Sequence, residues 1–120
     1  MTNLDHYFRF RAAIGEIIDT RFHTLEWLDV EVQSSRARLW ATEHSIIIAT
    51  LKEYPTGALE VHGLVAAGDL AGILDLIPHA ENWGRRVGAI VACIESRPGW
   101  AKALAGDGYE PYQLTLRKEL

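Results

Sequence analysis

Apolar and polar residues recur with two different periods along this chain, and the period marks its helices and strands. Between residues 4 and 22 the apolar side chains return at helical spacing, which predicts an amphipathic helix. A second, short helix is expected after Thr24, a favourable N-cap residue. Helical spacing returns over residues 69–87, with Asp69 as the expected N-cap and Gly88 as the residue that ends the helix.

The remaining apolar segments have the pattern of strands. Alternation or a continuous β-branched run is found over residues 37–42, 45–54, 58–66, 89–95 and 112–118. Short turns separate the first three, which predicts an antiparallel meander. A short helix that begins at Pro98 and ends at Gly106 and Gly108 is expected between the last two strands. The order α-α-β-β-β-α-β-α-β predicts the α/β class (an α+β mixed sheet), with helices on both faces, in a single domain over residues 1–120.

Length, charge and hydropathy indicate which partners and which location to expect. A chain of 120 residues is the size of one domain, and its net charge of −4 argues against a nucleic-acid partner. No apolar run approaches the roughly 20 residues that span a bilayer, so no membrane association is expected. The first ten residues are polar and mixed in charge, unlike a signal peptide, so a cytoplasmic location is expected.

Cysteine and histidine give no sign of a metal centre. Cys93 is the single cysteine, which excludes an intrachain disulfide and a cysteine-based zinc site, and its apolar surroundings predict a buried thiol. The five histidines show neither an i, i+4 pair nor an HExxH motif, so no metal site is expected.

The C-terminal third resembles a known family. Residues 83–120 read "WGRRVGAIVACIESRPGWAKALAGDGYEPYQLTLRKEL": a helix end, an apolar strand, a short helix stopped by Gly and an aromatic residue, and a last strand. This ending resembles that of the GNAT (N-acetyltransferase) superfamily, and the whole chain resembles it in the order of its elements. The form of the segment is most similar to short GNAT-like proteins of tailed phages and phage-derived elements.

The resemblance implies acetyl-CoA chemistry, but several family positions differ. The family binds the diphosphate with a basic, glycine-rich run at the start of the helix after the fourth strand. Here that junction reads "VAAGDLAGIL", Asp69 brings a carboxylate to it, and no Lys or Arg occurs from residue 53 through 84. In the family, a tyrosine often serves as the general acid, and the matching position here is Leu104. Many members carry an asparagine before the last helix, and the matching position here is Arg97.

Glu60 and His62 are the best catalytic candidates. They lie two residues apart on the expected third strand, so alternation places them on one face of the sheet. The pair could act as an acid/base couple. It could equally be a solvated polar face or a structural hydrogen bond.

Two functions are therefore expected from the sequence. The first is a GNAT-like domain that has lost acetyl-CoA chemistry and serves as a structural or interaction protein, such as a phage-derived virion or assembly component. It would bind no cofactor and would contact a protein partner or its own copies through Arg97 and Trp100, since interfaces favour Arg and Trp. The alternative is a divergent N-acyltransferase that uses acetyl-CoA, with Glu60 or His62 as the general base.

Overall fold

One four-stranded sheet organises the chain. The computed structural model describes residues 1–96 and 99–120. Its strands are β1 (Ala37–Ala41), β2 (Ser45–Glu53), β3 (Leu59–Gly68) and β4 (Ala89–Ile94), which lie in the order β1-β2-β3-β4. The first three strands form the predicted antiparallel meander, and β4 pairs in parallel with β3.

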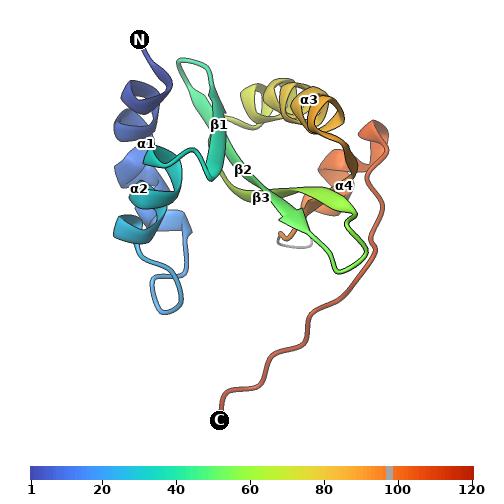
Figure 1. Cartoon of the computed structure of the whole chain (residues 1–120). Helices are drawn as coiled ribbons and strands as arrows, with labels where there is room; N and C mark the ends of the chain where they lie inside the picture. Colours follow the sequence, from blue (N-terminus) through green and yellow to red (C-terminus); the bar gives the residue numbers. More distant parts are fainter. Residues whose placement is uncertain (97–98) are drawn as a thin grey trace.

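Helices cover both faces of the sheet (Figure 1). The helices are α1 (Asn3–Ile17), α2 (Leu25–Gln33), α3 (Leu70–Val87) and α4 (Gly99–Leu104), and the 3-10 turn η1 (Ala105–Asp107) follows α4. Helices α1 and α2 lie against one face, and α3 and α4 lie on the other. The predicted fold class, a mixed sheet between two helical layers, is confirmed.

The β-branched run of β2 explains how both faces come to be buried. Ile46 and Ile48 point into the core beneath α1 and α2, whereas Ile47 lies between them in sequence and packs beneath α3. Successive side chains of a strand point to opposite faces, so a continuous apolar run can serve two cores at once.

A partly buried ion pair joins α1 to α2. The Arg11 guanidinium donates to both carboxylate oxygens of Asp29, at 2.9 and 2.8 Å, and the Tyr7 hydroxyl donates to the same carboxylate. The hydrogen bonds from Arg11 hold the pKa of Asp29 below its ordinary value, although burial acts in the opposite direction. The two helices therefore meet the sheet as one unit.

The C-terminal segment differs from its prediction. Residues 112–118 alternate as a strand does, yet the structure contains no strand there, and the chain runs away from the sheet after η1 (Figure 1). Alternation makes a segment suitable for a sheet, but a strand forms only against a partner strand. The end of the segment contacts the loop between α1 and α2 instead, where Arg21 and Glu119 form an ion pair at 2.8 Å.

Candidate functional site: a slot between diverging strands

Strands β3 and β4 pair along only part of their length. Their register runs from Leu59 opposite Ala89 to Gly63 opposite Ile94, whereas β3 continues to Gly68 without β4 beside it. At the point of divergence, the register between β2 and β3 shifts so that Leu64 is an extra residue on β3. Such a bulge increases the local twist of a strand, which helps to turn β3 away from β4.

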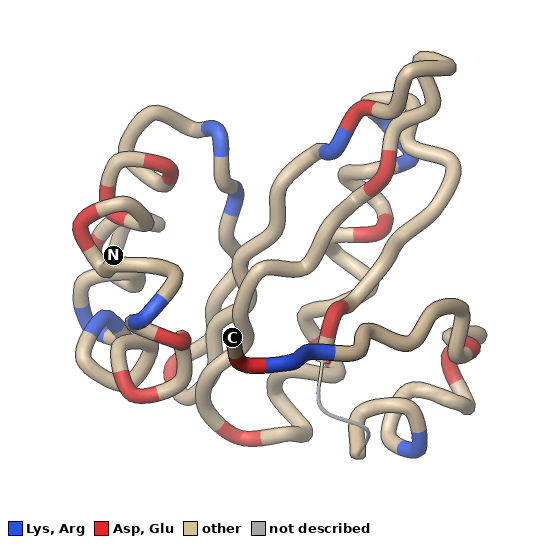
Figure 2. Tube along the Cα trace, turned by 90° about the horizontal axis from the view of Figure 1, so that it is seen from below, with Lys and Arg blue, Asp and Glu red and all other residues tan. Residues whose placement is uncertain are grey.

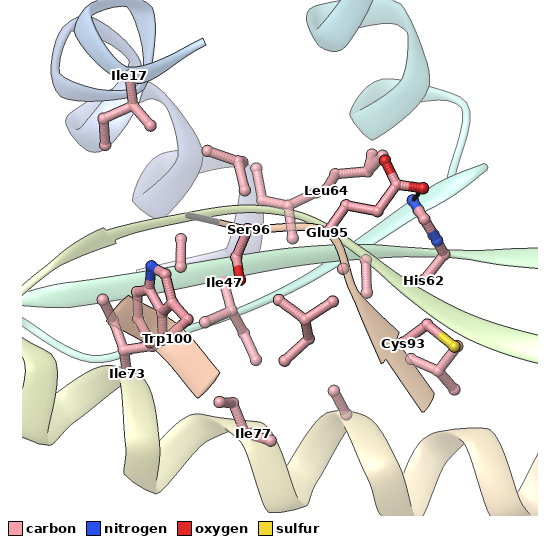
Figure 3. Close-up of a pocket in the computed structure, with 18 of the residues that line it drawn as sticks. Ile17, Ile47, His62, Leu64, Ile73, Ile77, Cys93, Glu95, Ser96 and Trp100 are labelled. Atoms are coloured by element: carbon pink, nitrogen blue, oxygen red, sulfur yellow. Dashed lines mark ion pairs between the residues drawn. The ribbon is translucent and has the colours of Figure 1, made fainter. Parts of the chain in front are cut away.

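The divergence opens a cavity of about 790 Å³ through the sheet. Leu64 of β3 and Ile94 of β4 line it at the level of the sheet, Ile73 and Ile77 line it from α3, and Ile17 lines it at the end of α1. Figure 3 shows Leu64, Ile73 and Ile77 around the slot, with Trp100 of α4 close to Ile73. Residues of both helical layers therefore reach one continuous space.

The charged side chains around the cavity have one sign. Its lining includes the carboxylates of Glu16, Asp19, Glu81 and Glu95, and no Lys or Arg is found among the lining residues that the structure describes. A cavity with this lining favours a cationic group over an anionic one.

Glu60 and His62 meet in the structure as a hydrogen-bonded pair. Glu60 is 3% exposed, and one of its carboxylate oxygens lies 2.9 Å from Nδ1 of His62. A carboxylate can only accept, so Nδ1 carries a proton in this contact, and Nε2 is the nitrogen that can take up or release a proton. His62 itself lines the cavity, with Nε2 3.8 Å from the exposed carboxylate of Glu95 (Figure 3).

Three donors keep the buried Glu60 carboxylate ionised. Burial alone would raise the pKa of Glu60, but hydrogen bonds from Tyr54, Cys93 and His62 together lower it below its ordinary value. The Tyr54 hydroxyl lies 2.7 Å from the carboxylate, and this hydrogen bond raises the pKa of Tyr54 to about 12. Burial, and to a smaller extent the hydrogen bond to Glu60, raises the pKa of Cys93 to about 11. Cys93 is therefore a neutral, half-buried thiol in the cavity wall.

The N-terminus of α3 is capped by its own chain. As predicted, Asp69 is the N-cap, and its carboxylate accepts from the backbone N–H of Gly72 at 2.7 Å. The hydroxyl of the buried Ser45 donates to Asp69 as well. This end of the helix thus already holds an anion, and its residues do not fit the diphosphate cradle that the GNAT resemblance implies.

The remaining residues that the sequence singled out are Leu104, Trp100 and Arg97. Leu104 is 3% exposed in the core beneath α3 and has no proton to transfer. Trp100 packs against that core and lines the cavity, while Arg97 lies outside the described residues. Their role as partner contacts stays a prediction.

The sequence analysis missed one contact in the cavity wall. The Tyr109 hydroxyl donates to Glu81 of α3 at 2.6 Å, and both residues line the cavity. The two residues are 28 positions apart, so no local spacing indicates their contact.

Several solved structures that resemble this one are named as acetyltransferases. A GCN5-related N-acetyltransferase from Ralstonia eutropha has a TM-score of 0.76 at 14% identity, covering 97% of this chain and 94% of that one. A Trypanosoma brucei acetyltransferase has a TM-score of 0.74 at 10% identity, covering 99% and 96%. The fold is GNAT-like. A glucosamine-6-phosphate N-acetyltransferase from Arabidopsis thaliana is also similar (TM-score 0.70, 11% identity, 99% and 94% covered). No family model matches the sequence, and no curated protein matches it significantly.

These comparisons correct the first expectation from the sequence. The prediction of a non-catalytic phage structural protein is wrong, because the GNAT-like structures named above are acetyltransferases and not phage structural proteins. Substitutions at single family positions suggested a loss of chemistry. The open slot between β3 and β4 depends on the tertiary structure and has no local signature in the sequence. Among the described residues, no helix is both long and apolar enough to cross a bilayer.

Proposed function

We propose that the protein is an N-acyltransferase that transfers an acyl group from an acyl-CoA thioester to an amine. The observation that carries this proposal is the Glu60–His62 pair, in which Glu60 holds Nδ1 and leaves Nε2 of His62 at a slot between two diverging strands. Beyond Gly63, the edge of β3 that faces the slot has no pairing with β4. The amide groups of an extended pantetheine arm are suited to hydrogen-bond such an open strand edge.

His62 is the base in this proposal, and Glu60 positions it. Nε2 of His62 takes a proton from the acceptor ammonium, and the free amine then attacks the thioester carbonyl carbon. The new C–N bond forms, the attacking nitrogen gives up a second proton to solvent, and the C–S bond breaks. The sulfur leaves as a thiolate that takes up a proton from solvent, so the products are a neutral amide and the free thiol. Glu60 is buried and hydrogen-bonded on both oxygens, so its role is to fix the tautomer and orientation of the imidazole.

The charge of the lining supports an amine as the acceptor. An amine arrives at neutral pH largely as an ammonium ion, and Glu95 lies beside His62 where such a group would give up its proton. The anionic nucleotide half of CoA finds no complementary positive charge in this lining or at the Asp69 cap. We therefore expect the pantetheine arm to supply most of the affinity for the acyl donor.

Thermal unfolding with separate pieces of the donor tests the proposal. We expect acetyl-CoA and acetyl-pantetheine to raise the melting temperature to a similar extent, and adenosine 3′,5′-bisphosphate to leave it unchanged. A ligand at 100 times its Kd stabilises the native state by about 2.7 kcal/mol, so even weak binding is measurable at millimolar concentrations. Release of free thiol from acetyl-CoA in the presence of primary amines measures the reaction. Absence of both stabilisation and thiol release would contradict the proposal.

The Asp69 cap gives a separate prediction about the nucleotide half. Asn is as good an N-cap as Asp but carries no charge, so Asp69→Asn should keep the stability of the protein within about 0.5 kcal/mol. Loss of the negative charge at the helix N-terminus should tighten CoA binding about two- to fivefold. Calorimetric titration measures this change. Acetyl-pantetheine is the control ligand, and equal tightening for both ligands would contradict the assignment.

A further inference from the structure

The C-terminal tail, residues 111–120, has the sequence pattern of a strand but pairs with no strand of the described chain. Tyr112, Leu114 and Leu116 alternate with polar residues and are 86%, 85% and 85% exposed. Figure 2 shows the charged run that follows them at the C-terminus. Three large apolar side chains at period two are the pattern of a strand with one buried face, and here that face is open to solvent.

Strand β4 is an edge strand of the sheet. It pairs with β3 on one side, and none of the described residues pairs with its other edge. Ile90 and Val91 of β4 are 74% and 49% exposed. Open apolar edges of this kind attract another strand, and proteins normally cover or charge them.

The tail of a given chain is held away from its own β4. Both guanidinium nitrogens of Arg21 contact the Glu119 carboxylate, at 3.0 and 2.8 Å. The Arg117 guanidinium lies 4.8 Å from the centre of the Phe22 ring. These contacts tie the tail to the loop between α1 and α2, and Figure 1 shows the tail leading away from the sheet.

We propose that the tail pairs with the outer edge of β4 in a second copy of the chain. Every copy carries one unpaired strand and one unpaired edge, so a reciprocal exchange across a two-fold axis satisfies both at once. Residues 112–118 are one residue longer than the six-residue β4, so the segment can span the whole strand. The partner is therefore the protein itself, and the exchange supplies the predicted last strand from the neighbouring chain.

The exchange also bears on the cavity. Cys93 and Glu95 lie in and just after β4, and both line the cavity. A strand paired to the outer edge of β4 fixes the strand that carries this wall. The proposal nevertheless stands on the tail and the edge alone, and it does not depend on acyl transfer.

Light scattering on the full chain tests the assembly. We expect a mass of twice 13.4 kDa for the wild type. Thr115→Pro removes a backbone N–H from the middle of the tail, and should raise the dimer dissociation constant at least about tenfold. Thr115→Val keeps the N–H and the strand preference, so this matched control should stay dimeric. A monomeric wild type, or a dimer that survives Thr115→Pro, would overturn the proposal.

Engineered disulfides distinguish exchange from closure within one chain. In a Cys93→Ser background, which keeps a donor for Glu60, Ile90→Cys is combined in turn with a cysteine at 112, 114 or 116. Exchange predicts that oxidation gives a covalent dimer on a non-reducing gel for at least one pair. A disulfide confined to single chains in every pair would show that the tail folds onto its own β4, which overturns the proposal. Circular dichroism should show the same folded spectrum for all variants.

Discussion

Replacing His62 with alanine should lower kcat about 10²- to 10⁴-fold, the usual contribution of a general base. The side chain of His62 is only partly exposed, but it borders a cavity, so the change should leave the fold and the binding of acetyl-CoA nearly unchanged. Thiol release at saturating acetyl-CoA measures kcat, and the thermal shift with acetyl-CoA measures retained binding. His79→Ala, which removes an exposed histidine on α3, is the matched control and should keep full activity.

Glu60→Gln tests the positioning role separately. A glutamine amide can donate to Nδ1 of His62, which would move the ring proton to Nε2 and remove the base without removing the imidazole. We expect a loss of kcat together with a changed tautomer of His62 in nitrogen NMR spectra. An unchanged kcat for His62→Ala would contradict the assignment of the base, whatever acyl donor the protein binds.

Gly68→Ala should destabilise the protein by about 3 kcal/mol or more. Gly68 has a φ of +105°, which L-residues rarely adopt, and a Cβ at this position would lie 2.0 Å from the backbone oxygen of His44. Because the obstacle is backbone, it cannot move aside as a side chain can. Urea denaturation measures the loss of stability.

Gly57→Ala is the matched control for the steric part of this effect. Gly57 also has a positive φ, of +86°, but nothing lies within 4 Å of an added Cβ. The conformational cost alone is about 1–2 kcal/mol, so Gly57→Ala should lie in that range. Equal losses at the two positions would show that the contact with His44 does not matter.

Local patterns predicted the elements well, because their causes are local. The N-caps Thr24 and Asp69 accept hydrogen bonds from residues three positions away. The continuous run of isoleucines in β2 by itself indicates a strand that is buried on both faces. The slot could not be predicted in this way. It depends on the extra residue Leu64, on the point where β4 ends, and on a contact between Glu81 and Tyr109 far apart in the chain. The last strand was predicted wrongly for a related reason, since alternation in residues 112–118 does not determine whether another strand pairs with them.

The hydrogen bonds around Glu60 have a consequence for how this sequence can change over evolutionary time. Loss of the Glu60 carboxylate would leave donors from Tyr54, Cys93 and His62 without their acceptor in a buried place, which costs stability even if catalysis is irrelevant. Selection for folding alone would therefore keep Glu60, with or without the proposed reaction. Among homologues, the identity of residue 62 would distinguish active from inactive descendants, and residue 60 would not.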